Sequence, residues 1–188
     1  DGIQELICNL FAESDAEKFA ETCFDKIIKA SEDEKSKQLL QKLKNSKEIK
    51  EDLKNIIRSH ELIKAGCNII AEKNINENIK YVMENEQIRT LISDLIINDD
   101  VQDFLKEESK DKFGAGKIIE SLKNPLVRHP LISLVMSDED FQKCFAELLS
   151  TGDSNFDIRN FFKNNPFIAN VEAGAIIGAA CGDASGSY

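Results

Sequence analysis

The sequence predicts an all-α protein of about a dozen short helices, packed as an irregular bundle or as stacked helical hairpins. Residues that favour helix are plentiful, while glycine and proline number only 9 and 3 in 188 residues. Apolar residues recur at helical spacing, and the alternation typical of strands is nearly missing. Tryptophan is absent, so we expect a core of isoleucine, leucine and phenylalanine.

Helix boundaries are marked by capping residues and by glycine or proline. Capping boxes are predicted at Ser14–Glu17 and Ser31–Glu34, with a shorter acidic version at Ser137–Asp140. Ser46 and Asn76 are further predicted N-caps. Helix stops are predicted at Gly114–Gly116, Asn124–Pro125, His129–Pro130, Thr151–Asp153 and Asn165–Pro166.

The apolar stripes between these marks predict the buried helix faces. An early stripe consists of Phe19, Cys23 and Ile27. Three later stripes each follow a polar cluster, NSKE, ENEQ or SDED, and each cluster follows an aliphatic residue. Unequal intervals separate them, so any repeat is degenerate, and both stacked hairpins and an irregular bundle fit the pattern. The later stripes are Ile49, Leu53, Ile56 and Ile57; Ile88, Ile92, Leu95 and Ile96; and Phe141, Phe145, Leu148 and Leu149.

The charge balance argues against a nucleic-acid partner. Acidic residues outnumber Lys and Arg by 34 to 24, giving a net charge of −10, and a phosphate-binding surface needs clustered bases. No apolar run is long enough to span a bilayer, and the first residues lack the features of a signal peptide. We therefore expect a cytoplasmic protein, although secretion of a mature chain stays open.

Cysteine and histidine give no metal or catalytic motif. The five cysteines are widely spaced and include no C-x-x-C pair. We expect them to be buried, reduced thiols, with a Cys8–Cys23 disulfide as the alternative. His60 and His129 have no metal-ligand spacing. No catalytic, cofactor-binding or metal-binding residue is therefore predicted.

The end of the sequence differs in composition from the rest. In Gly174–Tyr188, glycines recur at every fourth position, which favours a helix in close contact with others. The pattern around Gly178, Gly182, Asp183 and Gly186 resembles the opening helix of the ADP-ribosylglycohydrolase family. That resemblance implies an all-helical enzyme with two Mg²⁺ ions that removes ADP-ribose from proteins or related substrates.

The metal-binding Glu that usually follows in that family does not occur before Tyr188. We therefore expect residues 1–168 to form a helical module and residues 169–188 to begin an ADP-ribosylglycohydrolase-like domain. This chain alone is expected to have no hydrolase activity, since one Asp cannot supply the carboxylates that metal-assisted cleavage needs.

Three functions fit a helical module of this kind. The first is a non-catalytic protein-interaction or targeting module, which binds a protein partner or the ADP-ribosylated substrate of an attached domain. The second is a lipid or small-molecule carrier with an apolar cavity. Tyr81–Leu122 is similar, mainly in aliphatic spacing, to the helical repeat of insect digestive-tract allergens, which enclose lipid. The third is an enzyme with a cleft that gathers His60 or His129 with a cysteine or acids.

Overall fold

The computed structural model describes residues 13–110 and 114–151, and within them it is all-α, as predicted. These residues form ten helices joined by short turns, and no strand occurs among them. The helices are α2 (Glu13–Ala30), α3 (Glu34–Lys44), α4 (Lys47–Arg58), α5 (His60–Ile70), α6 (Ile75–Glu84), α7 (Glu86–Ile97), α8 (Asp99–Glu108), α9 (Ala115–Ser121), α10 (Pro125–Met136) and α11 (Glu139–Thr151). None of these helices combines the length and apolar character needed to cross a bilayer.

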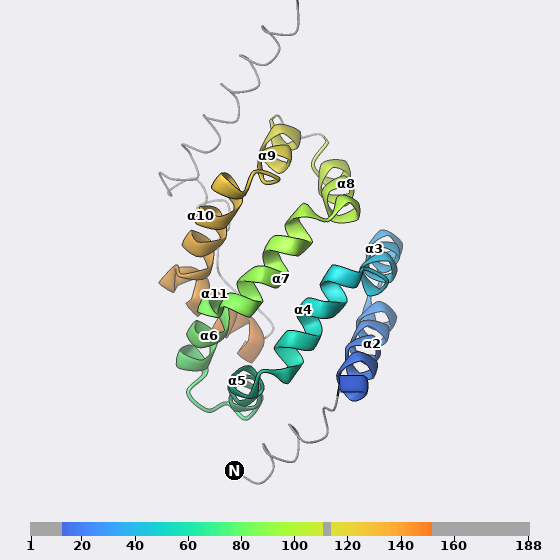
Figure 1. Cartoon of the computed structure of the whole chain (residues 1–188). Helices are drawn as coiled ribbons and strands as arrows, with labels where there is room; N and C mark the ends of the chain where they lie inside the picture. The colour runs from blue at the N-terminus through green and yellow to red at the C-terminus, as the bar shows by residue number, and fades with distance from the viewer. Residues whose placement is uncertain (1–12, 111–113, 152–188) are drawn as a thin grey trace, which may run out of the picture.

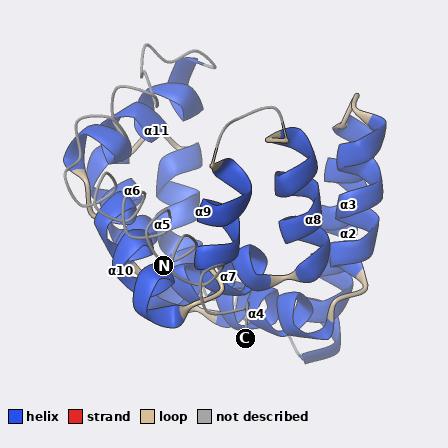
Figure 2. Ribbon diagram, turned by 90° about the horizontal axis from the view of Figure 1, so that it is seen from above, coloured by secondary structure: helices blue, strands red, loops and turns tan. Residues whose placement is uncertain are grey.

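Nine of the described helices form three units of three, and successive units run in opposite directions. The units are α3–α4–α5, α6–α7–α8 and α9–α10–α11, and each packs beside the previous one in reversed order. As a result α4, α7 and α10 form a central row (Figure 1). One outer row contains α3, α8 and α9, the other α5, α6 and α11, and they lie on either side of the centre (Figure 2). α2 packs against α3 and α4.

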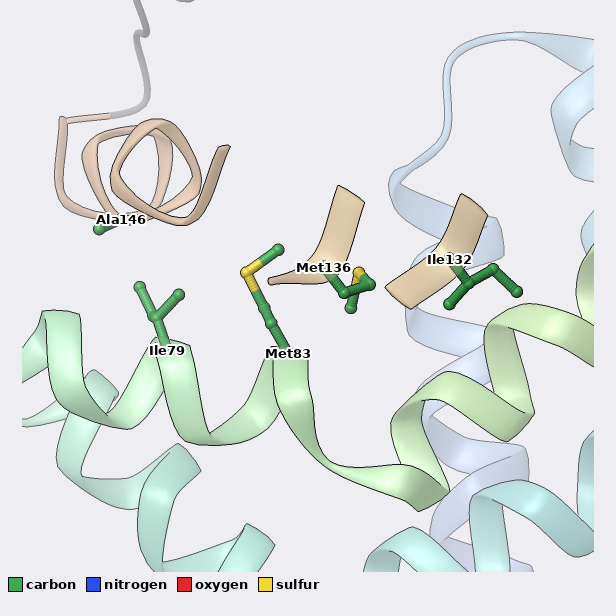
Figure 3. Packing of buried hydrophobic residues seen from close by; sticks show 5 residues of the cluster. All are labelled: Ile79, Met83, Ile132, Met136 and Ala146. Atoms are coloured by element: carbon green, nitrogen blue, oxygen red, sulfur yellow. The ribbon is translucent and has the colours of Figure 1, made fainter. Parts of the chain in front are cut away.

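α7 joins two hydrophobic clusters because apolar residues lie on two of its faces. The first cluster brings together α6, α10 and α11, and Ile88, Ile92 and Ile96 of α7 pack against it. Its buried side chains converge from the three helices in Figure 3: Ile79, Met83, Ile132, Met136 and Ala146. The second cluster is built on Phe24, Leu43 and Ile49, with Leu91 and Leu95 packed against it. The predicted α7 stripe is therefore confirmed as core.

Several helices follow one another with only one to three residues between them. Asn85, Asn98 and Asn124 cap α7, α8 and α10 by accepting hydrogen bonds from backbone N–H groups two or three residues ahead. Asp138 accepts in the same way from the N–H of Phe141 in α11. These short connections are what fold the chain back on itself.

At the same four junctions a second side chain bonds the end of the helix before the turn. It lies four residues after the capping residue and donates to the backbone carbonyl six residues earlier. The four bonds are Arg89 Nε to Met83 O, Gln102 Nε2 to Ile96 O, Arg128 Nη1 to Leu122 O and Gln142 Nε2 to Met136 O. Carbonyls in a last helical turn have no partner within the helix. The repeated bond therefore gives a donor to a backbone carbonyl that the tight turn would otherwise leave without one.

The buried face of α2 differs from the prediction. Phe19 and Ile27 are 45% and 54% exposed, while Ala16, Ala20 and Phe24 are buried. Both sets have helical spacing, so periodicity alone could not choose between them. The small Ala side chains allow α2 to approach α3 and α4 closely, which explains the outcome. In α11 likewise, Phe145 of the predicted stripe is exposed and Ala146 is buried.

Some predicted boundaries are also wrong. Ser46 is the N-cap of α4, as predicted, but α3 is capped by Asp33 rather than Ser31. Asn76 lies inside α6, whose N-cap is Asn74. Pro130 does not stop a helix but lies within α10. It lies in the second turn on an exposed face, where water can satisfy the carbonyl that lacks a proline N–H partner.

Some predictions fall outside the described residues. These are the family-like residues Gly178, Gly182, Asp183 and Gly186, the boundary near residue 168, Cys8, Cys181 and the helix stop at Asn165–Pro166.

Replacing a junction donor is expected to destabilise the fold. Gln142 is buried, and its Nε2 lies 2.8 Å from Met136 O. The variant Gln142→Met keeps the side-chain size but leaves that carbonyl without its donor, so the free energy of unfolding should fall by about 1–3 kcal/mol. The control Gln41→Met, at an exposed position of α3, should change it by less than about 0.5 kcal/mol. Equal urea midpoints for the two variants would contradict the role of the junction bond.

Candidate functional site

Two neighbouring pockets lie along α7 in the central row. The α7–α10 pocket has a volume of about 420 Å³, and its lining includes Arg89, Ser93, Arg128 and His129. The α4–α7 pocket has a volume of about 200 Å³ and is lined by Asp52, Asn55, Glu86, Gln87 and Thr90. Glu86 and Thr90 line both pockets. We call the two together the α7 groove.

The α7–α10 pocket is built around two arginines that cross between antiparallel helices. Arg89 of α7 donates from Nη1 to Ser133 Oγ at 3.3 Å and from Nη2 to Ser137 Oγ at 2.7 Å. Arg128 of α10 donates in the opposite direction, from Nε to the buried Ser93 Oγ at 2.7 Å. These bonds fix both guanidinium groups in place.

Arg128 carries a positive charge into a largely buried position. Its residue is 7% exposed, and Nη1 donates to the carbonyls of Leu122 and Lys123 at 3.0 and 2.8 Å. Neither Arg128 nor Arg89 forms an ion pair with a carboxylate anywhere in the described ranges. The Lys residues on other surfaces behave differently, as in the pairs Lys35–Glu107 and Lys106–Glu120. The pocket thus holds two fixed guanidinium groups that form no ion pair with its two carboxylates, Glu86 and Asp94.

The α4–α7 pocket is lined by two acidic residues, Asp52 and Glu86, together with uncharged polar residues. Asp52 of α4 interacts with Asp94 of α7, and its Oδ2 is buried with no donor among the described residues. Burial and then the neighbouring Asp94 carboxyl raise the pKa of Asp52 to about 6, with smaller contributions from Glu51 and Glu48. Asp52 therefore keeps its proton to a higher pH than an exposed aspartate does.

Other groups in the described residues do not form a comparable site. A third pocket of about 490 Å³ lies between the α5–α6 turn and α11, but its charged residues Glu72, Glu77 and Lys143 are exposed. Cys23, Cys67 and Cys144 are half-buried thiols, less buried than predicted. His60 is exposed at the start of α5, so the histidines are not brought together. In residues 13–110 and 114–151, no group of three His, Cys, Asp or Glu could hold a metal ion.

Of the residues that line the α7 groove, the sequence analysis named only His129, as part of an enzyme cleft with acids. A signal was present, because Arg89 and Arg128 each lie four residues after an asparagine cap, at Asn85 and Asn124. Only four arginines occur in the chain, and two of them line one pocket. Asp52 gave no such signal, since its partner Asp94 comes from a different unit of the fold.

The raised pKa of Asp52 makes the stability of the fold depend on pH. In the unfolded chain an Asp has a pKa near 3.9, below the folded value of about 6. Between these values the folded state binds more protons, so the free energy of unfolding falls as pH rises through this window. The variant Asp52→Asn cannot ionise and should be about 1 kcal/mol more stable than the unchanged chain at pH 8. Its advantage should vanish near pH 4, as measured by urea unfolding.

The control for this measurement is Asp103→Asn, which neutralises an exposed carboxylate of α8. It should not reproduce the change in the size of the effect between pH 4 and pH 8. An Asp52→Asn effect that is the same at both pH values would refute the raised pKa.

The bond from Arg128 to Ser93 is expected to contribute to stability. The variant Ser93→Ala leaves the buried Arg128 Nε without its acceptor, so the free energy of unfolding should fall by about 1–2 kcal/mol. Ser133→Ala removes an acceptor from Arg89 at an exposed position and should cost less than about 0.5 kcal/mol. If urea denaturation gave a larger fall in the free energy of unfolding for Ser133→Ala than for Ser93→Ala, the burial of Ser93 would not be what makes its bond important.

No family model, curated protein or solved structure matches this chain. Its function is therefore inferred from the residues of the α7 groove.

Proposed function

We propose that this chain is a non-catalytic helical module that binds a protein partner through the α7 groove. The observation that carries the proposal is the pair Arg89 and Arg128, held in fixed positions without an ion pair in the described part of the chain. Side chains that are fixed before binding lose little entropy when a partner arrives. Packed helical units also supply an extended surface on which such groups can be presented.

The chemistry of the pockets supports a polar partner more than a lipid. The three pockets characterised above are all lined by charged side chains, whereas a site for an apolar molecule is lined mainly by hydrophobic groups. A carrier with an apolar cavity therefore has less support than an interaction module.

An enzyme is the second candidate, because the α7–α10 pocket gathers His129 with Asp94 and Glu86. A general base usually has a hydrogen bond that orients it and a nucleophile within reach. His129 is exposed, and its ring makes no such bond to a described residue. The binding function is therefore the stronger proposal. Hydrolysis of p-nitrophenyl esters or phosphates that is lost in Asp94→Asn would reverse this order.

The resemblance of Gly174–Tyr188 supports a position for this module beside an ADP-ribosylglycohydrolase-like domain. In that arrangement the module directs the hydrolase to a protein substrate or partner. The Mg²⁺ ions implied by the resemblance would belong to the attached domain, since the described residues provide no metal-ligand cluster.

Selection from a random 12-residue peptide display library tests the proposed function. The purified chain should enrich peptides that bind it saturably, with dissociation constants on the order of 10 μM. Immobilised serum albumin serves as the control for non-specific capture. If the chain enriches no peptide beyond that control, the interaction function is refuted.

A further inference from the structure

Corresponding positions of the three central helices show which side of the last unit is uncovered. The capping residues of α4, α7 and α10 are Ser46, Asn85 and Asn124, which recur at equal intervals in the chain. Positions in these helices can therefore be compared by counting from the cap. The first set lies four and eight residues after the cap, and the second set lies two, six and ten residues after it. Because a helical turn takes 3.6 residues, the two sets lie on opposite sides of each helix.

The first set of each central helix faces a neighbouring helix. In α4 it faces α2, since Lys50 and Lys54 form ion pairs with glutamates of that helix. In α7 and α10 it faces the pocket that these two helices share, which Arg89 and Arg128 line. The first set therefore joins α4 to α2 and α7 to α10.

The second set faces the opposite neighbour. Asp52 of α4 and Gln87 of α7 belong to this set, and both line the pocket between α4 and α7. Since α10 meets α7 with its first set, its second set faces away from α7. That set consists of Leu126, Pro130 and Leu134.

The second set of α10 is apolar, and much of it is uncovered within the described residues. Leu126 is 82% exposed, Pro130 is also exposed and Leu134 is half-buried. α10 ends the central row in Figure 1, and the described helices that pack most extensively on it are α6, α7 and α11. We call Leu126, Pro130 and Leu134 the α10 end face. Because burial of apolar surface is favourable, this face suits an apolar occupant.

The sequence supplies an apolar segment soon after α11. That helix ends at Thr151 and packs on α10, so the chain continues beside the third unit. Residues 152–155 are long enough to span about 13 Å, more than the distance of about 8–10 Å between the axes of packed helices. The large apolar residues in the range 156–168 are Phe156, Ile158, Phe161, Phe162, Phe167 and Ile168.

We infer that residues 156–168 bind the α10 end face and complete the central row at that end, as α2 does beside α4. The chemistry of the two surfaces matches, because both are apolar. A linked segment has an effective concentration on the order of millimolar, which favours it over a second copy of the chain. The α7 groove takes no part in this contact, so the inference stands or fails independently of the proposed function.

The first test compares two leucine or isoleucine positions of equal exposure in the full chain. Leu126 and Ile70 are 82% and 85% exposed among the described residues, so without an occupant Leu126→Ser and Ile70→Ser should behave alike. With residues 156–168 on the end face, Leu126→Ser loses a buried contact, and the urea midpoint should fall by about 1 M. Ile70→Ser should lower it by less than about 0.3 M.

The second test identifies the occupant. A segment variant carries Phe161→Ser, Phe162→Ser and Phe167→Ser together, and circular dichroism checks that it keeps its helices. In this variant Leu126→Ser should shift the urea midpoint by less than about 0.3 M, because two residues in contact do not act additively. In the unchanged chain, nuclear Overhauser contacts should join the Leu126 methyl groups to phenylalanine rings, and the segment variant should lose them.

Three results would overturn the inference. The first is an equal midpoint shift for Leu126→Ser and Ile70→Ser. The second is a full Leu126→Ser effect that persists in the segment variant. The third is a dimer in sedimentation equilibrium that Leu126→Ser dissociates, since the occupant would then be a second copy. If a variant does not fold, the contacts of Leu126 in the unchanged chain decide the question, and their absence counts against the inference.

Discussion

The fold depends on one hydrogen bond that recurs at each short turn within the units α6–α7–α8 and α9–α10–α11. Such a turn leaves the last carbonyls of the first helix inside the protein, and these need a donor. Here the donor comes from the second helix, four residues after its capping side chain, as in Arg128 to Leu122 O. Because both ends of the turn are fixed, the angle between the helices is also fixed. The same bond therefore joins the helices within both of these units.

The choice of donor at these junctions also determines the chemistry of the surface. At two junctions the donor is Gln102 or Gln142, which satisfies a carbonyl and adds no charge. At the other two it is arginine, which reaches further and also bonds a serine of the neighbouring unit. Since α7 and α10 lie side by side, the two arginines line one pocket. A structural bond and a candidate binding site therefore use the same side chains.

The sequence was sufficient to predict the helical class and the stripe of α7, because these depend on residues close in the chain. It was insufficient wherever the choice depends on a distant partner. α2 has two apolar faces, and packing against α3 and α4 selects the one with Ala16 and Ala20. Pro130 is tolerated because its face of α10 is exposed. The pKa of Asp52 is raised only when α4 and α7 pack together, which buries Asp52 and brings it beside Asp94, 42 positions later in the chain.

Charge placement distinguishes the α7 groove from the other surfaces of the described chain. Elsewhere, cations and carboxylates of different helices pair, as Lys42 does with Asp100 at 2.8 Å. Such pairs stabilise little individually but leave no charge unmatched. In the groove, Arg89 and Arg128 line the same pocket as Asp94 but form no ion pair with a described carboxylate, and Asp52 lies beside another carboxyl, that of Asp94. Because these charges are not paired with one another, they stay available to a binding partner, as the proposed function requires.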